Sequence, residues 1–180
     1  MSVLSQAATA GQSLDDASVS KLVGDALPVE DYRGKKILLI VPDGTRTAPV
    51  GLLFKSIYRQ IGEATAALDV MIALGTHPPM SEEAICKRLE ISLEERHGEY
   101  ANVKFHNHEW DNPEALQEIG IIPAAEIAEL SDGRFEMELP AKINRRLFDY
   151  DQVIIVGPVF PHEVVGFSGG NKYLFPGVSG

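Results

Sequence analysis

The sequence predicts an α/β fold in which a mostly parallel, Rossmann-like sheet has helices on both faces and one antiparallel hairpin. Short aliphatic and β-branched runs, typical of strands buried on both faces, recur along the chain, and helical patterns separate them. The runs are KILLIV (residues 36–41), DVMIAL (residues 69–74) and VIIV (residues 153–156). The hairpin is indicated by Ser131-Asp132-Gly133 between EIAEL and RFEMEL, although EIAEL could also close a helix.

Length and composition favour one folded domain. The 180 residues are enough to bury a core, and the hydrophobic fraction of 44% and the charged fraction of 23% are near the averages of globular proteins. Residues 1–12 are small and polar without periodicity. We therefore expect a mobile arm over residues 1–12 and a single α/β domain over residues 13–180.

Charge and cysteine content restrict the partners and the location. The net charge of −10, from 16 basic and 26 acidic residues, argues against nucleic acid as a partner. Cys86 is the only cysteine and is expected to be a buried thiol in a helix, which suits a reducing cytoplasm. The sequence has neither a signal-peptide pattern nor an apolar run that could span a bilayer. The prediction is a cytoplasmic protein without a membrane partner.

The helices are predicted from apolar spacing and capping residues. Ser13 and Asp16 resemble a capping box at the start of a short helix that ends at Pro28. Ser92 and Glu95 form a second such box. Further helices are predicted over residues 50–62, 81–89 and 141–151, the last of these leading into the strand at residues 153–156.

Two histidines lie in an alternating segment, VKFHNH (residues 103–108), which predicts a strand with one solvated face. His106 and His108 would share that face. Their spacing is near that of metal ligands, but a zinc site needs at least a third ligand. We therefore interpret both as solvent-facing strand residues.

Polar side chains follow three of the predicted parallel strands, where the strands end. Because parallel strands all end at the same edge of their sheet, these loops should converge there, which is where open α/β sheets bind ligands. The candidate residues are Asp43, Thr45 and Arg46 after the first strand, His77 after the second, and His162, Ser168, Gly169, Gly170 and Lys172 after the third.

The chemistry of this set suits a small anionic acid. An arginine can bind a carboxylate through two hydrogen bonds, a histidine can exchange protons near neutral pH, and a lysine can bind phosphate or act as a nucleophile. The glycine pair allows positive φ and a close approach to a bound group. Other interpretations remain open: Asp43 could cap a turn, Arg46 could be a solvated surface residue, and Gly-Gly before Lys172 could be an ordinary turn.

Three motifs carry a resemblance to a known family. The segments PDGTRTAP, ALGTHPPMSEEAI and GPVFPHEVVGFSGGNKYLFPG resemble, in order and in internal spacing, the three N-terminal motifs of the nickel-dependent lactate racemase family. The resemblance covers residues 22–177. It implies that this chain is the N-terminal part of a longer two-domain protein.

The resemblance also implies a cofactor and residue roles. The cofactor is a nickel pincer nucleotide, nickel pyridinium-3,5-bisthiocarboxylic acid mononucleotide, covalently attached through a lysine. By motif matching, the paired acid/base residues are His77 and His162, the substrate-binding residues are Arg46, Asp43 and Thr45, and the cofactor-binding residues are Lys172, Ser168, Gly169 and Gly170. No nickel ligand is expected within this chain, because the family's histidine ligand is expected beyond Gly180, in the second domain.

The implied activity is racemisation or epimerisation of a 2-hydroxy acid by hydride abstraction and return, with one base for each enantiomer. The implied partners are the 2-hydroxy acid, a C-terminal domain of the parent protein and cofactor-maturation enzymes, and this part alone should be inactive. Gly44, Thr47 and Pro78 differ from the family pattern. Malate, longer 2-hydroxy acids and sugar acids are therefore candidates beside lactate.

Two other classes of function fit the same residues. One is a non-catalytic nucleotide- or phosphate-binding module that uses the FSGGNK loop (residues 167–172). The other is a domain that serves mainly to pack against a partner. The pair of histidines after parallel strands favours the enzyme over both.

Overall fold

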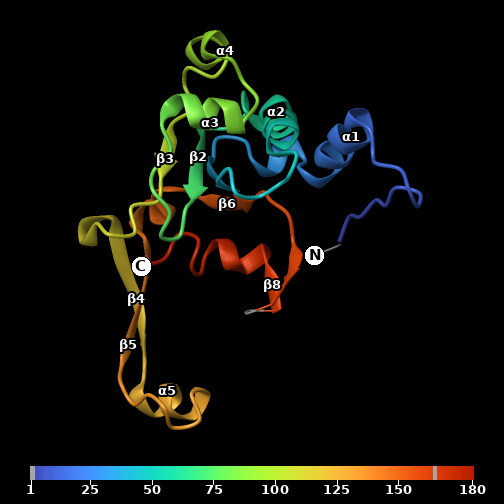
Figure 1. Cartoon of the computed structure of the whole chain (residues 1–180). Coiled ribbons are helices and arrows are strands. Elements are labelled where there is room, and N and C mark those ends of the chain that lie inside the picture. Colours follow the sequence, from blue (N-terminus) through green and yellow to red (C-terminus); the bar gives the residue numbers. More distant parts are fainter. Residues whose placement is uncertain (1–2, 164–165) are drawn as a thin grey trace.

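A parallel sheet forms the centre of the molecule in the computed structural model, which describes residues 3–163 and 166–180. Its four strands have the order β3-β2-β1-β6, and each neighbouring pair is parallel (Figure 1). They are β1 (Lys36–Pro42), β2 (Ala67–Ala73), β3 (Phe105–Asn107) and β6 (Gln152–Ile155). The predicted α/β fold and the three strands are confirmed, and β1 and β2 are buried as predicted, whereas β6 is only half-buried because it lies at the edge of the sheet.

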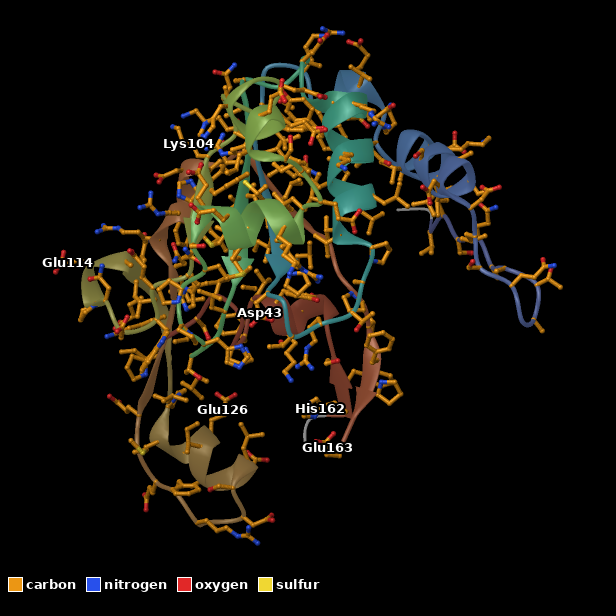
Figure 2. All side chains as sticks on the ribbon, turned by 45° about the horizontal axis from the view of Figure 1, so that its top comes forward. Asp43, Lys104, Glu114, Glu126, His162 and Glu163 are labelled. Carbon is orange, nitrogen blue, oxygen red and sulfur yellow. The ribbon has the colours of Figure 1, made fainter. Side chains whose placement is uncertain are left out.

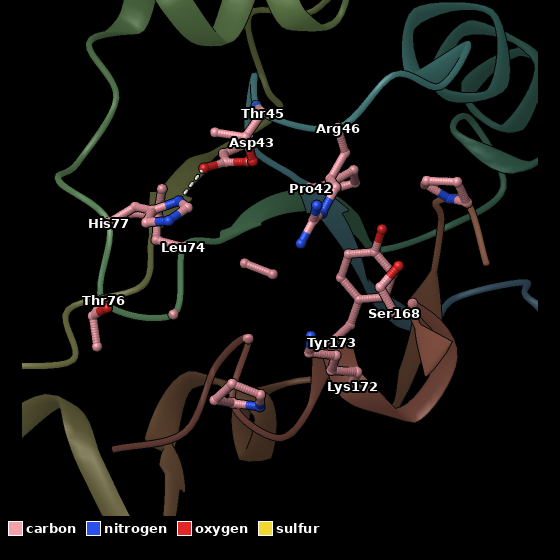
Figure 3. Close-up of a pocket in the computed structure, with 16 residues that line it drawn as sticks. Pro42, Asp43, Thr45, Arg46, Leu74, Thr76, His77, Ser168, Lys172 and Tyr173 are labelled. Carbon is pink, nitrogen blue, oxygen red and sulfur yellow. Dashed lines mark hydrogen bonds and ion pairs between the residues drawn. The ribbon is translucent and has the colours of Figure 1, made fainter. Parts of the chain in front are cut away.

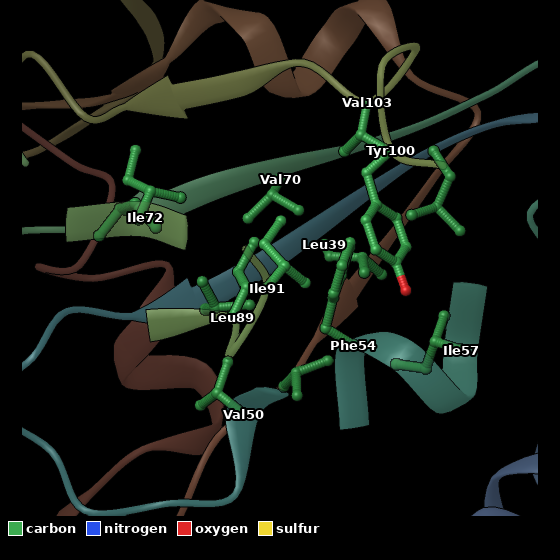
Figure 4. Close-up of a cluster of buried hydrophobic side chains, with 14 of the residues drawn as sticks. Leu39, Val50, Phe54, Ile57, Val70, Ile72, Leu89, Ile91, Tyr100 and Val103 are labelled. Carbon is green, nitrogen blue, oxygen red and sulfur yellow. The ribbon is translucent and has the colours of Figure 1, made fainter. Parts of the chain in front are cut away.

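The α-helices near the sheet cover one of its faces. They are α2 (Val50–Ile61), α3 (Glu82–Arg88) and α4 (Leu93–His97), and α1 (Asp16–Ala26) packs against α2 beside them (Figure 1). Successive strand residues point to opposite faces, so Leu39 and Val70 meet Phe54 of α2 in the main hydrophobic cluster (Figure 4). Cys86 lies in the same cluster, and burial raises the pKa of its thiol.

Short 3₁₀ helices and the C-terminal residues cover the opposite face. A second hydrophobic cluster lies on this face. It joins Leu38, Ile40 and Met71 of the sheet to Tyr173 and Val178. The 3₁₀ helices of the chain are η1 (Val29–Asp31), η2 (Pro113–Ala115), η3 (Arg145–Asp149) and η4 (Gly170–Tyr173). Both faces of the sheet are therefore covered, one by α-helices and one by η3, η4 and the chain that follows them.

An antiparallel hairpin projects from this body as an arm (Figure 1). Its strands are β4 (Leu116–Ile122) and β5 (Leu139–Asn144), and α5 (Ala124–Leu130) lies at its tip. The predicted turn at Ser131-Asp132-Gly133 does not join the strands. It ends α5, where the Gly133 N–H donates to the Ala128 carbonyl, so the alternative that EIAEL closes a helix is confirmed.

The helix predicted over residues 141–151 is wrong. Residues 141–144 belong to β5, and residues 145–149 form η3, which Asn144 begins by accepting a hydrogen bond from the Arg146 N–H. Pairing with β4, which is distant in sequence, overrides the local helical spacing. A second small hairpin joins β7 (Phe160–His162) to β8 (Gly166–Ser168).

Helix caps are partly as predicted. The capping box of Ser92 and Glu95 is confirmed at the start of α4. The box predicted at Ser13 is wrong, because Asp15 caps α1 by accepting from the Ser18 N–H at 2.7 Å. Residues 3–15 contain no helix or strand, and among the described helices none is long and apolar enough to cross a membrane.

His106 and His108 do not form the predicted solvated face. His108 is buried, its Nε2–H donates to the Ser179 carbonyl at 3.0 Å, and its Nδ1 accepts from Asn144 Nδ2 at 3.1 Å. His106 is half-buried, with Nε2 3.3 Å from the Tyr150 hydroxyl. The C-terminal residues that cover His108 lie far away in sequence, so local alternation did not reveal this burial.

The neutral form of His108 should contribute a pH-dependent part of the stability. Burial lowers its pKa below 6.5, so as the pH falls below about 6.5 the unfolded chain takes up a proton that the folded chain excludes. The free energy of unfolding should therefore decrease with acidification in this range. His108→Leu should lower stability by about 1–3 kcal/mol at pH 7.5, because Asn144 and Ser179 lose their partner.

Urea unfolding of the original chain and of His108→Leu at pH 7.5 and pH 5.5 measures both effects. The difference between the two chains should shrink at the lower pH. His97→Leu is the control, because His97 is exposed on α4. An equal His108→Leu difference at both pH values would contradict the assignment of the neutral form.

Candidate functional site

A cavity of about 210 Å³ lies at the carboxyl ends of β1 and β2, opposite η4 (Figure 3). Most of the candidate residues line it. Those that the fold brings together there are Asp43, Thr45, Arg46, His77, Ser168, Gly169 and Lys172. His162 and Gly170 are not among the lining residues.

Asp43 and His77 form the central pair of this pocket. The Asp43 carboxylate is nearly buried, and its Oδ2 lies 2.6 Å from His77 Nδ1 (Figure 3). Its Oδ1 accepts from the Thr45 N–H at 3.1 Å and from the Thr45 hydroxyl at 2.5 Å. Asp43 thus caps its turn and also orients the histidine.

Electrostatics keep this carboxyl ionised. Burial acts to raise the pKa of Asp43, but the hydrogen bonds from Thr45 and His77 outweigh burial and hold that pKa below its usual value. An ionised Asp43 accepts the His77 Nδ1–H, which leaves Nε2 of His77 available to a ligand. The arrangement is that of an aspartate-oriented histidine base.

Backbone hydrogen bonds fix the loop that carries His77. The His77 N–H donates to the Leu74 carbonyl, and the Gly75 N–H donates to the Gly177 carbonyl at 2.9 Å. Gly75 has a φ of 56°, which favours glycine. The tight turn after β2 therefore places His77 beside Asp43 at the end of β1.

Arg46 and Lys172 bring positive charge to the pocket from opposite walls (Figure 3). Over residues 3–163 and 166–180, no hydrogen bond or ion pair engages the Arg46 guanidinium or the Lys172 amine. The carboxylate that lines the pocket belongs to Asp43, and it already binds His77 and Thr45 instead of the two cations. The pocket is thus suited to an anionic ligand.

The glycine pair shapes the loop before Lys172. Gly169 and Gly170 have φ values of 91° and 55°, as the sequence predicts. A Cβ added to Gly169 would lie 2.0 Å from the Pro158 carbonyl oxygen. The close approach at Gly169 is therefore to the chain's own backbone after β6, and it sets the position of Ser168 and η4.

His162 lies at the end of β7, outside the pocket lining. Its Nδ1 is 3.8 Å from Glu163 Oε2, and Figure 2 shows both side chains away from Asp43. The pKa of Glu163 is lowered by a hydrogen bond to its own backbone and then by the charges of His162, Lys172 and Arg46. The structure thus does not join His162 to His77, although this hairpin end lies within electrostatic range of the pocket. Residues 164–165 lie outside the described part of the chain.

The sequence analysis missed two residues beside the pocket. Tyr173 lines it, and Arg88 of α3 donates from Nε to the Pro42 carbonyl at 3.1 Å. Burial lowers the pKa of Arg88, and the negative charge of Asp43 opposes that effect. Arg88 belongs to a helix, so the search for residues in loops after strands did not detect it, and nothing in the motif around Lys172 marked the neighbouring aromatic ring.

The residues of the pocket fit a covalent cofactor better than a bare metal ion. Lys172 offers an amine at the cavity wall. Among the described residues there is no group of three His, Cys, Asp or Glu side chains that could hold a metal ion. A metal at this site would need ligands from a cofactor or from another polypeptide segment. The histidine ligand expected beyond Gly180 would be of the second kind, and it stays a prediction, since the described chain ends at that residue.

Fold and site together define an α/β domain with a small cationic pocket at the carboxyl edge of its sheet. The chain belongs to the lactate racemase N-terminal domain family, whose model matches residues 16–180. This finding confirms the resemblance that the three motifs indicate.

Known proteins of similar sequence and structure agree with this assignment. A lactate racemase of Thermoanaerobacterium thermosaccharolyticum is 27% identical over 147 residues, which cover 81% of this chain and 30% of that protein. A Thermotoga maritima protein of known crystal structure is 38% identical in sequence. Its structure matches with a TM-score of 0.82 over 92% of this chain and 39% of that one. The lactate racemase apoprotein from Thermoanaerobacterium thermosaccharolyticum shares the fold, with a TM-score of 0.61 at 23% identity over 89% of this chain and 37% of that one. The chain therefore spans 30% to 39% of the length of these relatives.

Proposed function

We propose that this chain is the N-terminal domain of a racemase or epimerase that interconverts the enantiomers of a 2-hydroxy acid. The observation that carries the proposal is the Asp43–His77 pair beside two cations, Arg46 and Lys172, in one pocket. The cavity of about 210 Å³ is smaller than the pockets of about 300–1,000 Å³ that hold larger ligands. It suits an acid of the size of lactate.

Each side chain of the pocket has a defined task in this reaction. Arg46 binds the carboxylate through its guanidinium. Nε2 of His77 takes the proton of the 2-hydroxyl group and later returns it. Asp43 holds the Nδ1–H and stabilises the imidazolium cation that forms. His162 serves the opposite enantiomer as the second base, which requires the end of β7 to approach the pocket.

Lys172 would hold the cofactor, a nickel pincer nucleotide made by maturation enzymes of the same cell. Its amine lies at the pocket wall, with Ser168 and Gly169 beside it, so a covalent tether would start next to Arg46 and His77. When bound, the nucleotide supplies a group that accepts a hydride from the 2-carbon and returns it.

Racemisation tests this function in the longer parent protein loaded with nickel cofactor. Chiral chromatography after incubation with lactate, malate and longer 2-hydroxy acids should show exchange of at least one acid. His77→Gln should reduce the rate by about 10²–10⁴-fold, because the proton acceptor is lost. His97→Gln is the matched control and should leave the rate unchanged. Absence of exchange with every acid, despite confirmed cofactor, would remove the racemase and leave the binding module.

Substitution of Lys172 separates the enzyme from the phosphate-binding module. Arginine keeps the positive charge but cannot supply a nucleophilic amine. In the parent protein matured with the cofactor-making enzymes, Lys172→Arg should therefore abolish covalent attachment, while Lys87→Arg on α3 should keep it. Intact-protein mass spectrometry measures this. A mass increase of nucleotide size that persists in Lys172→Arg would show that Lys172 is not the tether.

The arm of β4, α5 and β5 provides the surface for the second domain. Large apolar side chains are exposed along it and at its base. A large exposed apolar surface on a folded protein marks an interface. They are Ile119, Ile121, Leu130, Phe135, Met137, Leu139 and Phe148. The relatives are between two and three times as long as this chain, so the parent protein has polypeptide available to cover the arm.

Ile121→Lys tests this packing. The side chain is 53% exposed here, so the thermal midpoint of the 180-residue chain should hardly change. In the parent protein the new ammonium group would be buried, and the midpoint should fall by several degrees. Leu4→Lys is the control for both proteins, because Leu4 is 49% exposed and lies outside the hairpin of β4 and β5. Equal midpoints for Ile121→Lys and the unchanged parent would place the second domain elsewhere.

A further inference from the structure

Tyr173 follows Lys172 on η4 and forms part of the pocket wall (Figure 3). Its ring packs with Leu38, Ile40 and Met71 under the sheet, and only 7% of the residue is exposed. A buried ring with two side-chain torsions has little freedom to move. The position of its hydroxyl group is therefore set by the core.

The hydroxyl of Tyr173 has no hydrogen-bond partner among the described residues. Tyrosine hydroxyls that are largely buried normally find one. Among the other tyrosines, Tyr58 donates to the Glu99 carbonyl at 2.8 Å and Tyr150 donates to Asp69 Oδ2 at 2.8 Å, whereas the hydroxyl of Tyr32, which is also 7% exposed, has no such partner among the described residues. The Tyr173 hydroxyl differs in that it belongs to a residue that faces the pocket.

Gly157, at the end of β6, leaves space for this hydroxyl. A Cβ added to Gly157 would lie 2.2 Å from the Tyr173 oxygen, so any other residue would displace the phenol. Gly157 has no positive φ, so backbone conformation does not explain the glycine. The glycine preserves the position of a polar group that makes no bond within the described protein.

Two arginines and one carboxylate act electrostatically on the Tyr173 phenol. Burial raises the pKa of Tyr173 and keeps the O–H protonated, while the charges of Arg46 and Arg88 act in the opposite direction. Nη2 of Arg88 is buried without a partner among the described residues. The nearby carboxylate, Asp43, is already bound by Thr45 and His77. Of these groups, Tyr173 and Arg46 line the pocket, and both are donors that a bound anion can satisfy.

We propose that the Tyr173 hydroxyl donates a hydrogen bond to the ligand carboxylate that Arg46 binds, and that Tyr173 is thus a ligand-binding residue of the pocket. The proposal rests on the proposed function for the carboxylic acid as ligand class, but not on catalysis. Two donors on one carboxylate fix its orientation. They present the 2-carbon and its hydroxyl group to His77 on the facing wall.

Propionate tests this contact in the 180-residue chain, because it has the carboxylate of lactate but no hydroxyl group that can be racemised. Amide shifts of residues 44–46 and 77 in ¹⁵N–¹H spectra, with sodium chloride at equal ionic strength as reference, give the Kd. Tyr173→Phe keeps the ring and should raise the Kd about tenfold, the loss expected for a hydrogen bond to a charged group. Tyr58→Phe is the matched control and should keep the Kd, whereas Arg46→Gln should abolish saturable binding.

Equal affinity of Tyr173→Phe and the unchanged chain would overturn the proposal, as would an equal loss in Tyr58→Phe. Absence of saturable shifts in the unchanged chain would also overturn it, because the pocket would then bind no carboxylate. Binding that depends on Tyr173 and Arg46, together with no racemisation by the parent protein, would keep this contact and reject only the enzymatic function.

Discussion

The hydrogen bond from the Gly75 N–H to the Gly177 carbonyl joins the two halves of the pocket. Gly75 begins the loop that carries His77, and Gly177 ends the segment that carries Lys172. One such bond contributes only about 1 kcal/mol, whereas each large apolar side chain that becomes buried contributes about 1.5–3 kcal/mol. Burial of Tyr173 and Val178 therefore holds the segment under the sheet, and the hydrogen bond sets its register.

The parallel register of β1 and β2 gives the other half of the geometry. Pro42 pairs with Ala73, so the residues that follow the two strands leave the sheet side by side. Asp43 is the first residue after β1, and a tight turn returns His77 to it. The pair at 2.6 Å thus follows from strand register and one glycine turn, and Arg88 of α3 adds a hydrogen bond to the Pro42 carbonyl next to Asp43.

The sequence predicted the parts of the site that follow local rules. The loops that follow two buried strands carry Asp43, Arg46 and His77. The positions of such loops are fixed once the sheet is parallel. Tyr173, Arg88 and His108 were missed or misinterpreted because their surroundings come from segments distant in sequence. The prediction of a helix over residues 141–151 was wrong for the same reason, because pairing with β4 determined the local structure. Local spacing cannot report which distant segment will cover a residue.

The binding of an acid that we propose for this chain must be a local effect. The chain carries a net charge of −10, so its long-range field repels an anion. Physiological salt screens exposed charges beyond about 8 Å, however, and inside that distance a ligand in the pocket meets Arg46 and Lys172. Asp43 does not cancel them fully, because it is one carboxylate beside two cations in the lining, and its two oxygens bind Thr45 and His77. The same carboxylate thus leaves the cations to the ligand and orients the base that would act on it.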